Sequence, residues 1–449
     1  MDRRLWLIVA LAAAMRAIGC LVHAMPGRDG VSYLWMAEQW AAGHGEQLFR
    51  QVFHPLYPWL VGLVLQVWPS LDPVAAGQLV AAGCSGLAVI PLVLATQRLF
   101  GAQAATWAGV MFAIGAWFVR HPAECLSEGP FHLFVLAWAA SLTAEKPRAV
   151  IGGLLAGAAF LIRPEGAALA LAGMLWHARR SGWRALLAHA VAAGLVAMLL
   201  PLGSLAAGEG FVLTPKAVFN WEVGVGGAEH GVLFYLRELA KLPGDAWEGL
   251  GYLVFPLAVL GAWRHRPRLV SLEFALLLPF LMQIVVIPLL RSNLRFVSGL
   301  GVLLLPFAGA TFAWLFGRVR APWRWCLVLA LVASEAKLWL GRPADRTIER
   351  DLGRWLGGQL KQHETLSCDM PRLWFFAGQK PPPPREIASP ELHGWAAAPE
   401  CVYVALRRGR NDAFLGELDG LGFAPMLLPE ELRSRSGAND VLLWRRRPR

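Results

Sequence analysis

Six ionisable side chains stand at the ends of apolar segments in this sequence, and their types suit chemistry on a phosphate-bearing substrate. They are Asp29, His54, Glu128, Arg163, Arg291 and Arg295. A carboxylate among aromatic residues suits a general base or a contact to a sugar hydroxyl. Guanidinium groups form paired hydrogen bonds to phosphate oxygens. Ionisable groups at the ends of membrane helices mark substrate sites by default, so we expect these side chains to share one site.

The elements that must position these residues are apolar runs, which fill most of the first 341 residues. Of the 449 residues, 56% are hydrophobic, and the mean hydropathy is +0.46. Runs of about 20 apolar residues predict transmembrane helices. Twelve runs qualify as candidates: 4–24, 55–70, 76–96, 104–120, 127–143, 149–163, 166–178, 184–205, 247–263, 269–290, 296–317 and 324–341. The composition therefore predicts a polytopic α-helical membrane protein.

Basic clusters along the chain give an independent prediction of topology. They occur at 2–4, 145–148, 177–184, 263–268 and 317–324. The positive-inside rule places these clusters in the cytoplasm, so the candidate site residues gather on the opposite face. The alternation requires 55–70 and 76–96 to make one crossing together, which predicts about eleven transmembrane helices and a cytoplasmic N-terminus. The same bias explains the net charge of +11, so we expect no nucleic-acid partner.

The composition changes near residue 342. Residues 347–363 have helical spacing, whereas "ETLSCDM" and "CVYVALRR" have the pattern of strands. We therefore expect a transmembrane domain of residues 1–341 and a small α/β domain of residues 342–449, which the topology places outside the cytoplasm. In that compartment Cys368 and Cys401 could pair as a disulfide or stay free.

Four stretches, in this order, resemble a known family. They are "RDGVSYLWMAEQWAAG", "FHPLYPWLVGL", "LSEGPFHLFVLAWAAS" and "GGLLAGAAFLIRPEG". Together they resemble the bacterial GT-C glycosyltransferases, in particular the family 39-like superfamily of protein O-mannosyltransferases and aminoarabinose transferases. The resemblance covers roughly residues 1–170 and continues more loosely through "RSNLRF" and "DMPRLWFFAGQ".

The resemblance implies a GT-C fold and an inverting glycosyltransferase that moves a hexose or pentose from a polyprenyl-phosphate donor to an envelope acceptor. In that family the acid of the first outer loop is the catalytic base, and here that position is Asp29. The sequence has "RDG" where some relatives have two acids, which leaves Glu38 and Glu128 as candidates for the second role. Substrate-binding roles are expected for His54, Tyr57, Glu128, Arg163, Arg291 and Arg295.

The expected partners are the lipid-linked donor, membrane lipids and an acceptor that is a lipid, a glycan or a protein. The expected location is the plasma (inner) membrane, with the C-terminal domain extracytoplasmic. No step of such a transfer requires a cofactor, and no metal-ligand spacing is visible in the sequence. Because some GT-C enzymes use a divalent metal ion, that alternative stays open.

Other readings of the same residues remain open. Asp29 and Glu128 could cap helices, Arg163 could extend to lipid headgroups, and Arg291 and Arg295 could contact anionic lipid. A transporter or flippase of lipid-linked or small polar substrates is the main alternative function. It should carry polar groups in the middle of several spans, where this chain has few besides Gln283. A purely structural assembly protein is a third reading.

Overall fold

The structure is a computed structural model that describes residues 3–216, 218–219, 231–290, 294–340, 346–382 and 389–447. It is 71% helical. Internal contacts divide the chain into two units. The helical unit comprises Met1–Ala24 and Met36–Gly341, and the sheet unit comprises Met25–Trp35 and Arg342–Arg449. The helix α2 (Arg28–Ala41) begins in the sheet unit's first segment and ends in the helical unit.

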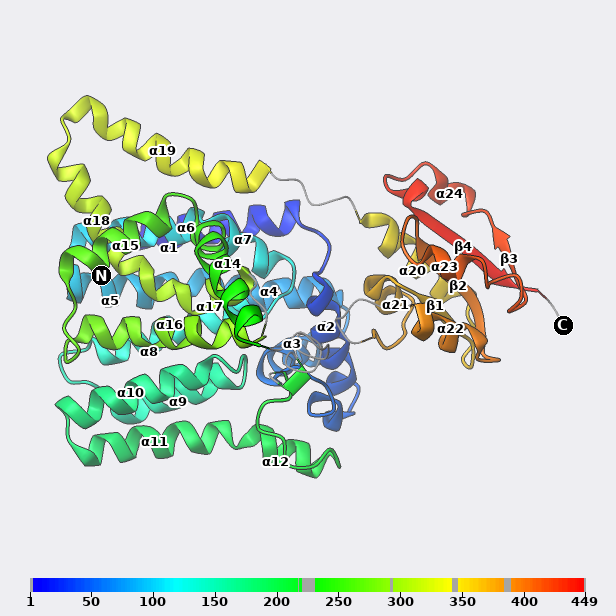
Figure 1. The fold of residues 1–449 in the computed structure, drawn as a ribbon, viewed down its shortest axis with the longest axis horizontal. Helices are drawn as coiled ribbons and strands as arrows, with labels where there is room; N and C mark the ends of the chain where they lie inside the picture. The colour runs from blue at the N-terminus through cyan, green and yellow to red at the C-terminus, as the bar shows by residue number, and fades with distance from the viewer. Residues whose placement is uncertain are drawn as a thin grey trace. The chain divides into compact units, whose positions relative to one another are not determined.

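The first part of the helical unit consists of short to medium helices joined by tight turns (Figure 1). Its elements are α1 (Arg3–Val22), η1 (Gly45–Leu48), α3 (Leu56–Val67), α4 (Pro73–Leu87), α5 (Val89–Phe100), α6 (Ala102–Ile114), α7 (Ala116–Ala123), α8 (Glu128–Leu142), α9 (Ala149–Phe160), α10 (Gly166–Arg180), α11 (Trp183–Ala197) and α12 (Leu199–Ala206). The second part contains α14 (Val232–Leu250), α15 (Val254–His265), α16 (Leu272–Val286), η2 (Ile287–Leu290), α17 (Leu294–Gly301), η3 (Val302–Leu304), α18 (Leu305–Arg318) and α19 (Ala321–Leu340).

Five described helices are long and apolar enough to cross a membrane, and the count rises to seven if two bent helix pairs each form one span. The chain is therefore a membrane protein with several apolar helices, but the predicted number of eleven spans is not confirmed. Helix length is the physical reason for the difference. The 12 residues of α9 extend about 18 Å, well short of the roughly 30 Å of hydrocarbon in a bilayer.

Two of the predicted runs are broken helices. The axis bends by 45° between α6 and α7, and by 110° between α14 and α15. Gly251, at the second break, has a φ of +106°, a conformation that favours glycine. Two side chains of α19 bind the backbone at the first break. Glu335 accepts a hydrogen bond from the Ala116 N–H (2.9 Å), and Trp339 donates one to the Ile114 carbonyl (3.2 Å). Each break leaves backbone groups unpaired, so side chains from other helices must satisfy them.

Glycines allow the helices of this unit to pack closely. In Figure 1, α9 lies beside α10 and α11, and all three pack together. A Cβ atom added to Gly153 of α9 would lie 2.3 Å from the His189 carbonyl oxygen of α11. One added to Gly309 of α18 would lie 2.5 Å from the Ala104 carbonyl oxygen of α6. Small residues at such contacts let helix backbones approach, which drives association in a membrane.

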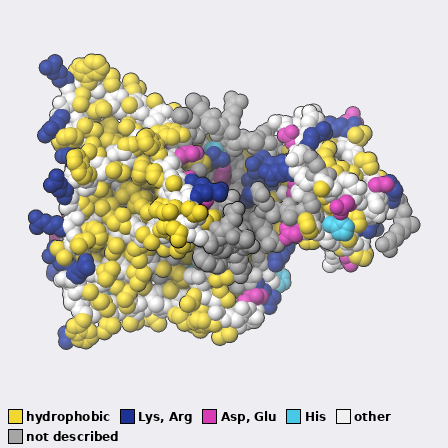
Figure 2. All heavy atoms as spheres, viewed as in Figure 1, with side chains coloured by type: hydrophobic (Ala, Val, Ile, Leu, Met, Phe, Trp, Pro, Cys, Tyr) yellow, Lys and Arg dark blue, Asp and Glu magenta, His cyan; other side chains and the backbone are white. Residues whose placement is uncertain are grey.

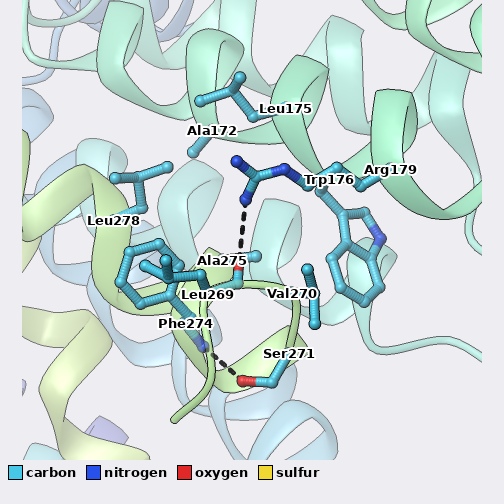
Figure 3. A pocket seen from close by; sticks show the side chains of 10 residues that line it. All are labelled: Ala172, Leu175, Trp176, Arg179, Leu269, Val270, Ser271, Phe274, Ala275 and Leu278. Carbon is cyan, nitrogen blue, oxygen red and sulfur yellow. Dashed lines mark hydrogen bonds between the residues drawn. The ribbon is translucent and has the colours of Figure 1, made fainter.

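Lys and Arg side chains gather along one end of the helical unit, at the left edge of Figure 2. The loops after α10 and α15 meet there, because Arg179 donates to the Leu269 carbonyl (2.9 Å) and Arg180 to the Val270 carbonyl (3.3 Å). Figure 3 shows Arg179 in a small crevice between α10 and α16. Three of the basic clusters used for the topology, 177–184, 263–268 and 317–324, therefore share one end, since Arg264 and Arg318 both lie over Trp314.

The sheet unit has a four-stranded sheet with strand order β1-β2-β4-β3. Strand β1 is parallel to β2, and the other two pairs are antiparallel. Tyr403 and Ala405 of β2 pack with α20 and α21, whereas Val404 and Leu406 pack with α22 and α23, as alternation along a strand requires. The elements are α20 (Thr347–Gln359), β1 (Thr365–Cys368), α21 (Pro371–Phe376), α22 (Ser389–Ala397), β2 (Cys401–Arg407), α23 (Asp412–Leu415), β3 (Phe423–Met426), α24 (Glu430–Arg433), η4 (Ala438–Asp440) and β4 (Val441–Arg446).

Strand register decides the question of a disulfide in this unit. Cys368 lies opposite Ala405, and Cys401 lies opposite Thr365. The two cysteines are thus offset by three residues along the sheet, about 10 Å, whereas a disulfide needs Cα atoms within roughly 7 Å. Both thiols are free and buried, so the alternative of a bridge between them is excluded.

We expect both thiols to be unreactive in the folded protein. Burial raises the pKa of Cys401 to about 12 and the pKa of Cys368 well above its usual value, so neither forms the reactive thiolate at neutral pH. Maleimide at pH 7 should label these two cysteines only after denaturation, as measured by peptide mass spectrometry. A Cys368–Cys401 bridge in a non-reducing digest would contradict the register.

Candidate functional site

A fully buried carboxylate joins two of the predicted site arginines in the helical unit. Glu128 is 0% exposed, and its Oε1 accepts hydrogen bonds from Arg163 Nη1 (2.7 Å) and Arg295 Nε (2.8 Å). The Arg163 side chain is 8% exposed and the Arg295 side chain 26%. The structure brings these three predicted residues together, because segments more than 160 residues apart meet at one oxygen atom.

Each member of the cluster stands at a helix end. Glu128 is the first residue of α8, where a negative charge is favoured by the helix dipole. Arg163 occupies the turn between α9 and α10, and Pro164 after it disfavours a helical conformation there. Arg295 lies in the first turn of α17. The alternative that Glu128 caps its own helix is not what the structure has, because its described hydrogen bonds go to the arginines.

Glu165 completes the cluster and was missed as a site residue in the sequence. Its Oε1 accepts hydrogen bonds from Arg163 Nη2 (2.8 Å) and Nε (3.2 Å). The guanidinium of Arg163 is therefore held by two carboxylates, and it also lies over the rings of Phe131 and Phe296 at 5.7 and 5.8 Å. The signal that could have identified Glu165 is its place in the "RPEG" stretch, two residues after the arginine.

The "FHPLYP" stretch packs against the turn that carries Arg163. His54 is 2% exposed, and its Nδ1 is hydrogen-bonded to the Phe160 carbonyl. The Leu56 N–H donates to the Leu161 carbonyl (3.0 Å). Tyr57 is also buried, and its hydroxyl donates to the Gly77 carbonyl (3.2 Å), which joins α3 to α4. The "FHPLYP" and "RPEG" stretches, which both carry the family resemblance, are thus neighbours in the structure. His54 and Tyr57 hold backbone near the cluster.

Buried polar atoms without partners lie next to the ion pairs. Glu128 Oε2, both ring nitrogens of His121, and His132 Nδ1 have no hydrogen-bond partner among the described residues. His121 lies within electrostatic range of Glu128 and Arg295, and His132 Nε2 is hydrogen-bonded to the Ser298 carbonyl (3.3 Å). Unpaired buried polar groups require an explanation such as a water molecule or a ligand. Neither histidine was singled out in the sequence: His132 lies inside the apolar run 127–143, and His121 directly follows the run 104–120.

The other predicted residues lie elsewhere. Asp29 is half-buried in the first turn of α2, in the part of that helix that belongs to the sheet unit. Glu38 follows nine residues later in the same helix, which puts it about 13 Å along the axis and on the opposite face. Glu38 is therefore badly placed to act on the same proton as Asp29. Arg291 lies outside the described residues.

The donor types in the site bear on metal binding. Within the described ranges, no group of three or more His, Cys, Asp or Glu side chains is placed to hold a metal ion. The two carboxylates of the cluster are hydrogen-bonded to guanidinium groups instead.

We expect Glu128→Gln to destabilise the helical unit strongly. The change removes the charge that compensates two arginines, and breaking a buried pair costs roughly 3–5 kcal/mol. The measurement is the midpoint of thermal unfolding in detergent, with Asp419→Asn as control, because the Asp419–Arg447 pair is exposed on the surface and contributes little. An unchanged midpoint for Glu128→Gln would show that the cluster does not hold the helices together.

Comparison with known proteins rests on the fold. No protein-family model and no curated protein matches the chain by sequence. ArnT from Cupriavidus metallidurans bound to undecaprenyl phosphate is similar over 99% of both chains, with a TM-score of 0.65 and 14% identity. Archaeal oligosaccharyltransferase AglB from Archaeoglobus fulgidus, in complex with an inhibitory peptide and a dolichol-phosphate, is similar over 88% of this chain and 69% of its own, with a TM-score of 0.57 and 12% identity.

The folds of both neighbours agree with the GT-C resemblance that the sequence motifs carry. The match covers 88% of this chain for AglB and 99% for ArnT. The chain therefore has the fold of the GT-C membrane glycosyltransferases.

Proposed function

We propose that this chain is an inverting glycosyltransferase that moves a hexose or pentose from a polyprenyl-phosphate donor to an envelope acceptor. One observation carries the proposal. A buried carboxylate fixes two guanidinium groups in a fold that, in ArnT, is bound to undecaprenyl phosphate. Guanidinium groups that are already oriented lose little freedom when they bind a phosphate, so they suit the recognition of such a donor.

The donor phosphate is proposed to bind at Arg295. This arginine is the more exposed of the two that Glu128 holds, with 26% of its side chain exposed. Arg163, held by Glu128 and Glu165, is proposed to keep Glu128 and so the Arg295 guanidinium in position. Arg291, four residues before Arg295 in the sequence, is proposed as a further phosphate contact. In this scheme Glu128 positions arginines and does not touch the sugar.

His54 and Tyr57 are proposed to shape the site from a distance. Both side chains are buried and bonded to backbone carbonyls, so their contribution would be to hold the turn of Arg163 and the start of α3. Substrate contact by His54 would use its Nε2, which has no partner among the described residues.

The proposed reaction is a single displacement. An acceptor hydroxyl oxygen attacks the anomeric carbon, and the carboxylate of Asp29 takes the hydroxyl proton. The bond between that carbon and the phosphate oxygen breaks, and the polyprenyl phosphate leaves with the electron pair. A positioned base contributes roughly 10²–10⁴-fold to such a step, and fixed guanidinium groups stabilise the charge that develops on the leaving phosphate. The scheme contains no metal ion and no cofactor.

The proposed orientation follows from the charge distribution. The end of the helical unit that collects the basic loops would face the cytoplasm. The N-terminus would then be cytoplasmic, and the sheet unit and the cluster would serve the outer face of the plasma (inner) membrane. The acceptor is proposed to be a hydroxyl-bearing lipid, glycan or protein of the envelope.

The test is transfer by the purified protein in detergent, supplied with native membrane extract that contains polyprenyl-phosphate sugars and acceptors. Loss of donor is followed by mass spectrometry, with and without EDTA. We expect the wild type and Asp419→Asn to consume one donor at equal rates in both conditions. Asp29→Asn should be slower by about 100-fold or more, because it lacks the base.

The alternatives give different results in the same assay. Equal rates for wild type and Asp29→Asn would keep the transfer and remove Asp29 as its base. A rate abolished by EDTA would place a metal ion in the reaction. No donor loss with wild type would overturn the proposed transfer and favour a transporter or flippase, which moves its substrate without consuming it.

A further inference from the structure

We propose that Arg372 is a positioning residue for Asp29, and that the sheet unit thereby sets the geometry of the catalytic base. The inference rests on the proposed function in one respect, since it takes Asp29 as the base. The contacts that support the proposal lie within the sheet unit, which contains both Met25–Trp35 and Arg342–Arg449.

One hydrogen bond connects Arg372 to the segment that carries Asp29. Arg372 lies in α21, and its Nε donates to the Pro26 carbonyl at 2.5 Å, across 346 residues of sequence. Pro26 is buried and Arg372 is 8% exposed, so water competes little for this bond. A hydrogen bond from a charged group is stronger than a neutral one, and burial strengthens it further.

The other end of Arg372 is fixed as well. Its Nη1 donates to Glu349 Oε2 (3.3 Å), and Glu349 is 1% exposed. The second carboxylate oxygen, Oε1, accepts a hydrogen bond from Arg407 of β2. The guanidinium therefore has one edge on a carboxylate anchored to the sheet and another on the Pro26 carbonyl. Because Arg372 is bound at both points, it fixes the position of the Pro26 carbonyl relative to Glu349.

The carbonyl that Arg372 binds stands just before the start of α2. The next carbonyl, on Gly27, accepts the first helical hydrogen bond, from the Val31 N–H (3.2 Å). Holding the Pro26 carbonyl thus fixes where and in which direction the helix begins. Asp29 lies in the first turn, three residues after Pro26, so its carboxylate moves with that start.

A second contact in the same unit supports this assignment. Lys380 Nζ lies over the ring of Trp35, 5.3 Å from its centre, at the far end of the same segment. The segment is therefore held at both ends by residues of the 342–449 part. The "DMPRLWFFAGQ" stretch, part of the family resemblance, thus has a structural role in this proposal. It supplies Arg372 and ends one residue before Lys380.

Catalysis should be sensitive to this bond because a base works only within hydrogen-bond reach of its proton. A displacement of about 1 Å can cost roughly 100-fold in rate, even when the cause is far from the chemistry. A shift of Asp29 alone leaves the phosphate site unchanged, so the loss should appear in kcat and leave the KM for the donor unaffected.

The test compares Arg372→Lys with Arg446→Lys. A lysine at 372 keeps the charge beside Glu349, but its single nitrogen cannot bind Glu349 and Pro26 in the same geometry. Arg446 is a matched control, because it also donates to backbone carbonyls of the sheet unit, at Cys401 and Ala398, and none of its described hydrogen bonds reaches 25–35. Hydrogen–deuterium exchange of the full-length protein in detergent reports on residues 27–35 with no donor present.

We expect Arg372→Lys to raise exchange in residues 27–35 about tenfold, as the loss of one charged hydrogen bond predicts, with other parts of the sheet unit unchanged. In the transfer assay its kcat should fall roughly tenfold or more at a donor KM within about twofold of wild type. Arg446→Lys should leave both readouts at the wild-type level.

Three outcomes would overturn the inference. Unchanged exchange in 27–35 would show that Arg372 does not hold the segment. Raised exchange with a normal kcat would show that the segment's position does not matter for transfer. A wild-type protein that consumes no donor overturns the proposed function and the catalytic half of this inference with it, while the exchange comparison still decides whether Arg372 holds the segment.

Discussion

The carboxylate of Glu128 has no exposure to solvent, and a buried charge is costly unless opposite charges and hydrogen bonds compensate it. In this protein the compensation comes from Arg163 and Arg295, which lie on separate parts of the chain. The first turn of α8, the turn between α9 and α10 and the first turn of α17 must therefore meet at one point. The same requirement leaves two guanidinium groups with fixed orientations, and a phosphate-binding site needs that property. The proposed phosphate site would therefore use the same three side chains that join these helix ends.

The sheet unit uses the same device. Glu349 is almost fully buried and joins Arg372 to Arg407, so one carboxylate again fixes two guanidinium groups from different elements. A third buried carboxylate, Glu335, works differently, because it binds a backbone N–H at the break between α6 and α7. In each case the carboxylate links elements that do not follow one another directly in the sequence. Three buried acids therefore each join separate elements of the chain.

Part of this arrangement was readable in the sequence. Glu128, Arg163 and Arg295 were predicted to share a site because they end apolar runs on one face, and the structure brings them together. The GT-C fold and the presence of several apolar helices were also predicted correctly. The number of eleven spans is not confirmed, because a run of apolar letters does not reveal a bend such as that at Gly251 or a helix as short as α9.

Other features depend on long-range geometry that no local pattern contains. The separation of Cys368 from Cys401 follows from strand register, and the grouping of residues 25–35 with the C-terminal part follows from contacts across more than 300 residues. Glu165 was adjacent to a predicted residue, yet its pairing with Arg163 depends on how the turn after α9 closes. Composition can locate charges at helix ends, but which charges pair is decided by packing.

The central claim is that guanidinium groups held by Glu128 bind the phosphate of a lipid-linked donor. Native mass spectrometry of the purified protein with undecaprenyl phosphate tests it most directly. The account predicts one bound lipid per chain, with an affinity at least about tenfold weaker in Arg295→Gln and unchanged in Arg264→Gln, whose arginine lies over Trp314 among the basic loops. Equal binding by all three proteins would contradict it.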